Sequence, residues 1–306
     1  MAKSGSKVSS HKYPFVVQIN SADHFCGGSL VDLDKVITAA HCVYNSNSKH
    51  FSPPSSLTVI AGSLTHKTDD EGDSTQKRSV VGIQTPEGTE SPFRTDQDIA
   101  LLFLSEPFQE TVYVKKIGTT SYITLDDDRP SNKIIAFISS KMVSTIPSKF
   151  QLTTICSVAE EDDSEMGGLV VAGMGYKLWD VKVDQSQWTR DPYLKELHLK
   201  HVATQECVSA MGGSSEYKTC TNQKAIFCVR QEEGKGDRTC GGDSGSTATR
   251  LKGKSAHCVL GVLALGAMCP TTEDNAYPMQ YTRINEYKQE RTETETDQFN
   301  LTTGIT

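Results

Sequence analysis

The feature that most constrains the fold of this chain is a series of short apolar segments that recurs along most of its length. The segments are rich in Val and Ile and are separated by polar turn residues, a pattern typical of β-strands. They are FVVQI, KVITAAHC, LTVIAGS, SVVGI, IALLFL, LVVAGMGY, AIFCVR and CVLGVLALG. An α/β sheet would need crossover helices between its strands, which this pattern lacks, so we predict an all-β barrel or sandwich.

Two segments have a helical pattern instead. The first is VATQECVSAM, and the second begins at Arg283 and continues through INEYKQER, whose polar composition indicates a C-terminal surface helix. The strand pattern weakens over residues 108–150, which we interpret as an inserted surface loop. Residues 289–306 are expected to form a flexible polar tail. The sequon that begins at Asn300 in this tail is usable only in a secreted chain.

Composition excludes several classes of function. A chain of 306 residues with 36% hydrophobic content can bury a full core, which disfavours overall disorder. The net charge of −7, without clustered Lys and Arg, argues against binding to nucleic acid or an anionic membrane surface. No apolar run approaches the roughly 18 residues that a membrane-spanning helix needs. The acidic loop TDDEGDS is interpreted as solvated rather than as a calcium site.

Nine cysteines indicate the compartment in which the chain folds. Several lie at separations that would close loops, as Cys26 and Cys42 do, and this usage suits an oxidising environment. No Cys-x-x-Cys pair or Cys/His cluster is spaced for zinc, so we expect no metal. The opening MAKSGSKVSS lacks the apolar core of a secretory signal. We therefore expect a secreted protein whose leader is absent from this sequence.

One stretch, TCGGDSGSTA, places Ser244 in a glycine-rich turn, where a nucleophile and an ordinary turn serine are both consistent with the pattern. A nucleophilic serine needs a histidine to accept its proton and an acid to orient that histidine. TAAHC places His41 after a small, apolar strand end. DQDIALLFL places Asp98 at the mouth of an apolar strand, where an unpaired carboxylate is unfavourable. Taken together in the order His, Asp, Ser, the three favour a catalytic set.

The segments TAAHC, DIALL and GDSG make the chain similar to the chymotrypsin/trypsin family of serine peptidases, from about Lys7 to Tyr287. The resemblance implies two six-stranded antiparallel β-barrels packed with the active site between them. It also implies these boundaries: a peptidase domain at 6–288, with a first barrel at about 14–107, a linker with the inserted loop at about 108–150 and a second barrel at about 151–282.

The same resemblance implies a role for each candidate residue. Ser244 would attack the scissile carbonyl, His41 would act as base and then acid, and Asp98 would hold the imidazole tautomer. The backbone N–H groups of Gly242 and Ser244 would form the oxyanion hole. The chemistry requires no cofactor. Protein or peptide substrates, and protein inhibitors as a further class, are the expected partners of a monomeric enzyme.

The family pattern also implies a set of disulfides. These would join Cys26 with Cys42, Cys207 with Cys228 and Cys240 with Cys269. Cys156, Cys220 and Cys258 are then left over, and an odd number of cysteines leaves at least one thiol unpaired within the chain.

The substrate pocket departs from the family pattern. Its floor is Arg238 where trypsin-like members have aspartate, and a permanent guanidinium charge would repel Lys and Arg and favour acidic side chains. The alternative is that Arg238 turns outward and Asp237 turns in. One wall runs from Ala264 to Gly266 in place of Ser-Trp-Gly. Met279 replaces a glycine in the other wall and would partly fill the pocket.

The activation segment departs as well. Family members are cleaved before Ile-Val-Gly-Gly, and the freed amine pairs with the aspartate that precedes the nucleophile, here Asp243. This chain has Ala2 to Gly5 at that place. Because a buried unpaired carboxylate is costly, Asp243 must find another cation, stay solvated or leave the oxyanion hole collapsed. Two hypotheses follow: a serine endopeptidase without typical tryptic preference, or a catalytically silent homologue that acts as a binding or regulatory protein.

Overall fold

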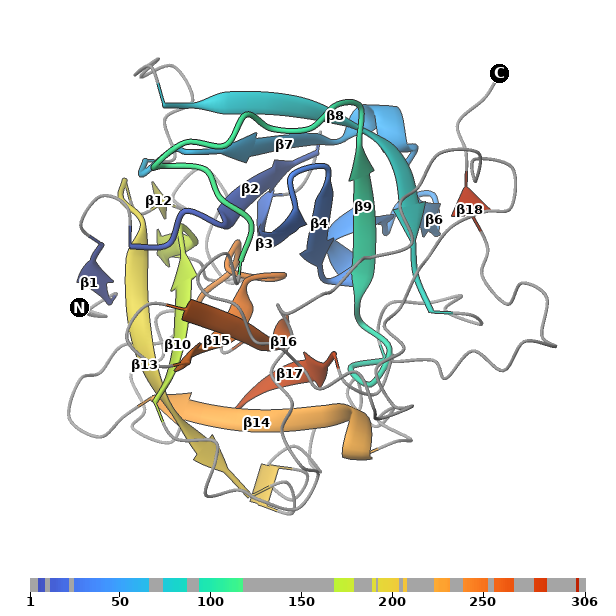
Figure 1. Ribbon diagram of the computed structural model, residues 1–306. Helices are drawn as coiled ribbons and strands as arrows, with labels where there is room; N and C mark the ends of the chain where they lie inside the picture. Colours follow the sequence, from blue (N-terminus) through green and yellow to red (C-terminus); the bar gives the residue numbers. More distant parts are fainter. Residues whose placement is uncertain are drawn as a thin grey trace, which may run out of the picture.

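In the computed structural model, almost all of the regular elements among the described residues are β-strands (Figure 1). The residues that it describes are 5–8, 12–21, 25–65, 74–86, 94–117, 168–178, 189–190, 192–203, 206–207, 223–231, 239–252, 256–266, 278–284 and 301–302. None of the helices in this described part is long and apolar enough to cross a membrane.

Six strands form the first barrel. In sheet order they are β8 (Gln76–Gln84), β7 (Thr58–Ala61), β2 (Val16–Asn20), β3 (Phe25–Asp32), β4 (Lys35–Thr38) and β9 (Ala100–Leu104). All neighbours are antiparallel, and pairing of β8 with β9 closes the barrel. Leu30, Val59 and Leu102 are fully buried in its core. Closure satisfies the backbone of both edge strands, which an open sheet would leave unpaired.

Six further strands form the second barrel. In sheet order they are β13 (Lys195–Val202), β10 (Leu169–Gly173), β15 (Thr247–Lys252), β16 (Ala256–Leu265), β17 (Met279–Arg283) and β14 (Ile226–Gln231). Pairing of β13 with β14 closes this barrel. The rings of Phe227 and Tyr281 stack at 5.3 Å in its core. The prediction of two six-stranded antiparallel barrels is therefore confirmed.

Short elements lie outside the barrel walls. They are β1 (Ser6–Lys7), β5 (Tyr44–Asn45), β6 (His50–Phe51), β11 (Tyr176–Leu178), β12 (Thr189–Arg190), β18 (Leu301–Thr302) and the 3-10 turns η1 (Ala40–Val43), η2 (Pro54–Ser56) and η5 (Gln223–Ala225). β1 adds to β13, and β18 adds to β8. The sequence predicts a flexible tail at 289–306, but Leu301 and Thr302 differ from this because they pair with the β8 backbone.

Residues 108–117, the described part of the predicted surface loop at 108–150, also differ from the prediction. Phe108, Val114 and Ile117 are buried in the core rather than exposed in a surface loop. Their backbone is held there as well, since the N–H of Ile117 donates to the carbonyl of Leu30 at 2.8 Å. The rest of the predicted insertion and the C-terminal surface helix beyond Ile284 lie outside the described residues.

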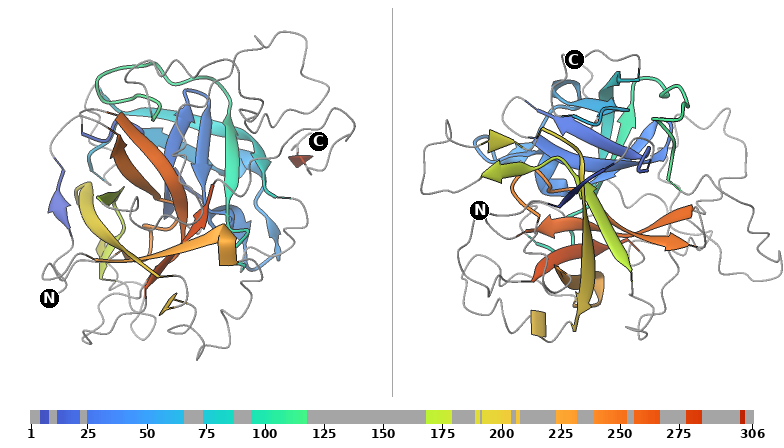
Figure 2. Two further views of the ribbon diagram at one scale, coloured as in Figure 1. Left: turned by 60° about the horizontal axis from the view of Figure 1, so that its bottom comes forward. Right: turned by 90° about the vertical axis from the view of Figure 1, so that its left-hand side faces the viewer.

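The two barrels pack directly against each other (Figure 2). One hydrophobic cluster includes residues of both, such as Leu30 from β3 and Val262 from β16. A buried hydrogen bond of 2.7 Å joins the hydroxyls of Ser29 and Thr247 across the interface. The interface is therefore fixed by apolar packing and by polar contacts. These include the contact of Gly27 with the Ser244 carbonyl and that of Thr282 with the Asp98 carbonyl.

Two of the predicted disulfides are confirmed: Cys26 with Cys42 and Cys207 with Cys228. Cys240 is also disulfide-bonded, and its predicted partner Cys269 lies outside the described residues. Cys258, which the sequence leaves without a partner, is disulfide-bonded too.

Candidate active site

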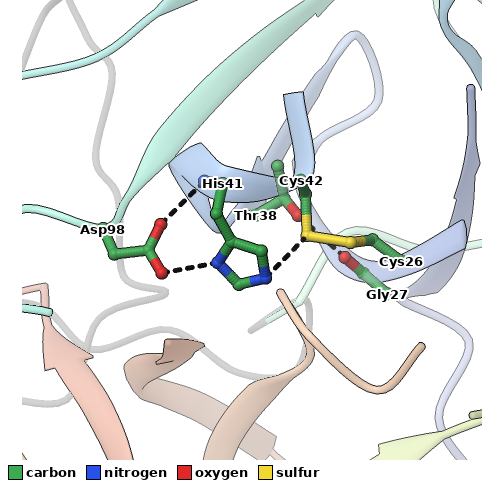
Figure 3. The surroundings of a disulfide bond; sticks show 6 residues. All are labelled: Cys26, Gly27, Thr38, His41, Cys42 and Asp98. Atoms are coloured by element: carbon green, nitrogen blue, oxygen red, sulfur yellow. Dashed lines mark hydrogen bonds and ion pairs between the residues drawn. A yellow bond between two sulfur atoms is a disulfide. The ribbon is translucent and has the colours of Figure 1, made fainter. Parts of the chain in front are cut away.

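His41 lies in the turn η1, between β4 and β5 of the first barrel. The preceding Ala39 and Ala40 are fully buried, and their small side chains let the turn sit tightly on the core. The disulfide between Cys42 and Cys26 of β3 fastens the same turn to the barrel wall (Figure 3). The His41 side chain remains 25% exposed. The backbone around the imidazole is thus rigid while its ring stays accessible.

Asp98 lies just before β9 and is only 2% exposed. Its carboxylate accepts two hydrogen bonds from His41, at 2.8 Å from the backbone N–H and at 2.6 Å from Nδ1 (Figure 3). Burial alone would lower the pKa of His41, but the charge of Asp98 and its hydrogen bond to Nδ1 raise it, and the net direction is upward. A proton on Nδ1 leaves Nε2 of the neutral ring as an acceptor.

The sulfur atoms near His41 do not make a metal site. Nε2 lies 3.8 Å from Sγ of Cys42, and Cys26 is close by. Both sulfurs are consumed in a disulfide, whereas metal binding by cysteine requires a thiolate. This cluster is the sole group of three or more His, Cys, Asp or Glu side chains, within the described part of the chain, that are close enough to share a metal ion. The absence of a metal from the whole protein stays a prediction.

Ser244 lies in a turn between two glycines with positive φ, Gly242 at +85° and Gly245 at +80°. A side chain at Gly245 would place its Cβ 2.2 Å from Oγ1 of Thr38, so this position must be a glycine. The Ser244 carbonyl accepts from the N–H of Gly27 at 2.8 Å. The serine turn of the second barrel is therefore anchored on β3, beside the disulfide that holds His41.

The N–H groups of Gly242 and Ser244 donate to no protein acceptor among the described residues. This leaves both donors free for a bound oxygen, as an oxyanion hole needs. No hydrogen bond joins His41 to Ser244 within the same described residues. In unliganded sites such a contact is often long and tightens only with substrate.

Asp243 is held by backbone donors. Its Oδ1 accepts from the N–H of Gly175 and its Oδ2 from the N–H of Cys240, each at 2.8 Å. A Cβ on Gly173 would lie 2.3 Å from the carboxylate, and one on Gly175 would lie 2.5 Å from it, so two glycines shape its cradle. Burial raises the pKa of Tyr281, and the negative charge of Asp243 raises it further. Ala2, whose amine the family pattern would pair with Asp243, lies outside the described residues.

The candidate pocket residues that are described lie close together. Met279 is 3% exposed, and its Sδ accepts a hydrogen bond of 2.8 Å from Oγ1 of the buried Thr239. A Cβ on Gly266 would lie 3.1 Å from the same hydroxyl. Ala264 is buried on β16, whereas Arg238 is outside the described residues. The methionine thus occupies space beside the wall strand.

Comparison with known sequences assigns the family. The family model described as Trypsin matches residues 2–136 and 135–289, which together span most of the chain. The chain belongs to the trypsin family. The Modular serine protease of Drosophila melanogaster is 37% identical over 101 residues. Coagulation factor IX is 32% identical over 108 residues in Cavia porcellus and 30% identical over 115 residues in Oryctolagus cuniculus.

These alignments are partial on both sides. They cover 32%, 35% and 37% of this chain, and 16%, 34% and 38% of the respective relatives. The trypsin-family chain therefore spans well under two thirds of the curated relatives that it matches.

Three residues near the site of this trypsin-family protein are missed by the sequence analysis. Thr239 contacts Met279, Gly175 shapes the Asp243 cradle, and Thr282 of β17 contacts the backbone of Asp98. Only Gly175 has a local signal, the Gly-x-Gly in LVVAGMGY. The two threonines look like ordinary strand residues, since their partners are distant in sequence.

Proposed function

We propose that this trypsin-family chain is a secreted serine endopeptidase that hydrolyses peptide bonds through an acyl-enzyme. The observation that carries the proposal is the pairing of His41 with Asp98, whose carboxylate binds both Nδ1 and the backbone N–H of the histidine. A buried carboxylate that fixes one imidazole tautomer is what a general base next to a serine requires.

In the proposed reaction, the Ser244 hydroxyl turns toward Nε2 of His41 and loses its proton to that nitrogen as Oγ bonds to the scissile carbonyl carbon. Asp98 stabilises the resulting imidazolium. The imidazolium then gives its proton to the leaving amine, and the acyl group stays on Ser244. Water repeats the sequence and releases the acid. Because the charge and hydrogen bond of Asp98 raise the pKa of His41, the base loses its proton at a higher pH than an ordinary histidine does.

The oxyanion would be bound by the N–H groups of Gly242 and Ser244, which are free of protein acceptors in the described chain. Donors of this kind act on the charge that develops in the transition state, and removing one slows catalysis by about 10² to 10³. The Asp243 carboxylate also supports the proposal, because its hydrogen bonds to two backbone N–H groups hold the turn that carries both donors.

The substrates would be proteins or peptides without the typical tryptic preference. Arg238 at the proposed pocket floor would repel a cationic side chain, and Met279 would reduce the depth of the pocket beside Ala264 and Gly266. Disulfides at Cys26 and Cys207 suit the secreted location. We also propose that the protein is a monomer and that protein inhibitors recognise it. We propose no nucleic-acid or membrane partner.

The test is covalent labelling of the full chain by a fluorophosphonate probe, which reacts with an activated serine. Wild type should label, and Ser244→Ala should not. Ser246→Ala is the matched control, because Ser246 is in the same turn but is 1% exposed and its hydroxyl makes no hydrogen bond. Equal labelling of wild type and Ser244→Ala would reject the nucleophile, and an unlabelled but folded wild type would favour the silent homologue.

A further inference from the structure

Thr282 connects the second barrel to the segment that carries Asp98. The side chain is fully buried on β17. Its Oγ1 lies 2.7 Å from the carbonyl oxygen of Thr95 and 3.2 Å from that of Asp98. A hydroxyl has one hydrogen, so it is shared between two carbonyls at either end of a four-residue segment. The contact spans 184 residues of sequence and crosses the interface between the barrels.

The Asp98 carboxylate itself has few contacts. Among the described residues, its hydrogen bonds come from His41 alone, from the backbone N–H and from Nδ1. Both partners belong to the residue that the carboxylate must orient. The carboxylate therefore depends on its own backbone for a fixed position, and Thr282 donates to that backbone.

Several hydrogen bonds near Asp98 lie within its own segment. The N–H of Gln97 donates to the carbonyl of Arg94, and the N–H of Ile99 donates to that of Gln97, each at 2.9 Å. The Arg94 guanidinium binds both carboxylate oxygens of the buried Asp96. These contacts shape the segment itself, whereas its placement against the second barrel requires contacts with that barrel. Thr282 supplies such a contact.

The strands around Thr282 also hold the serine turn. Thr282 pairs with Val262 on β16. The next residue on β16, Leu263, accepts from the N–H of Gly245 at 3.0 Å and donates to the carbonyl of Ser246 at 2.9 Å. The segment of Asp98 and the turn of Ser244 are thus fastened to two adjacent strands of one sheet.

We propose that Thr282 is a positioning residue: its hydroxyl fixes the Asp98 segment against the second barrel and so sets the placement of the His41–Asp98 pair relative to the Ser244 turn. The inference rests on the proposed peptidase function. A hydroxyl that is needed for placement should affect the rate of the chemical step, because misplacement of reacting groups by about 1 Å can slow catalysis by about 100-fold.

The experiment compares Thr282→Val with Thr282→Ser in the full chain. Valine keeps the shape of threonine but cannot donate, whereas serine restores the hydroxyl. We expect fluorophosphonate labelling and kcat/KM to fall about 10- to 100-fold in Thr282→Val with KM little changed, and to recover most of this loss in Thr282→Ser. Thr249→Val is the matched control, because Thr249 is equally buried and its hydroxyl donates to the carbonyl of Val170 within the second barrel.

A second measurement does not depend on catalysis. The pKa of His41 can be followed by NMR titration of its ring. Because the charge of Asp98 raises that pKa, loosening of the carboxylate in Thr282→Val should lower it, and Thr249→Val should leave it unchanged.

The outcomes separate the two proposals. If wild type does not label, the peptidase function fails, and a lowered His41 pKa in Thr282→Val still supports positioning. An unchanged pKa together with a labelling rate equal to wild type, or to Thr249→Val, overturns the positioning role. The positioning role is also overturned if the loss of labelling in Thr282→Val is no larger than the unfolded fraction that thermal melts show for this variant.

Discussion

The Asp243 cradle yields a prediction whose size follows from the structure. In Gly175→Ala, the new Cβ would lie 2.5 Å from Cγ and Oδ2 of Asp243, whereas ordinary contacts begin at 3.4 Å. The carboxylate must therefore move by about 0.9 Å, from 2.5 to 3.4 Å. Its hydrogen bonds to the N–H groups of Gly175 and Cys240, at 2.8 Å each, cannot both survive that movement.

The expected consequence is a loss of stability and a larger loss of activity. Each hydrogen bond to a charged group contributes about 1.5 to 3 kcal/mol, so the loss of one or both would cost about 1.5 to 6 kcal/mol. Asp243 lies between Gly242 and Ser244, and movement of this turn misplaces at least one oxyanion donor. We expect kcat/KM and the rate of fluorophosphonate labelling to fall by about 10² to 10³.

The assay is labelling kinetics at a temperature where thermal melts show the variant to be folded. Gly168→Ala is the control, since Gly168 has a positive φ of +70° but nothing lies within 4 Å of the position that a Cβ would take there. It should lose about 1 to 2 kcal/mol from backbone strain and keep its labelling rate. If folded Gly175→Ala labels as fast as Gly168→Ala, the Asp243 carboxylate does not hold the serine turn.

Two further predictions concern pH and specificity. In the pH profile of kcat/KM, activity should rise as His41 loses its proton, with a midpoint above the ordinary histidine pKa. Asp98→Asn removes the negative charge that raises the pKa of His41, so it should move that midpoint to lower pH. An unmoved midpoint would contradict the assignment of His41 as the base. Met279→Gly should increase cleavage after large apolar side chains by about tenfold relative to small ones in a peptide library. Strong turnover after Lys or Arg by wild type would oppose the proposed role of Arg238.

Much of this protein could be predicted from local patterns. Short Val- and Ile-rich segments identified strands such as β7 and β9, because side-chain shape and alternation act within a few residues. The placement of the Phe108 to Ile117 segment in the core could not be predicted in this way. Its burial depends on contacts such as that of Ile117 with Leu30, which a local hydrophobicity pattern does not contain.

The sequence by itself determined the strand-rich class, two confirmed disulfide pairs and the residue types of the candidate site. Only the tertiary structure decided which groups meet: Asp98 with His41 over 57 residues, Asp243 with Gly175 over 68, and Thr282 with Asp98 over 184. The physical reason is that such contacts depend on barrel closure and strand register. A register shift of one residue would turn the side chain of Thr282 on β17 to the opposite face and would displace the turns that carry the other residues.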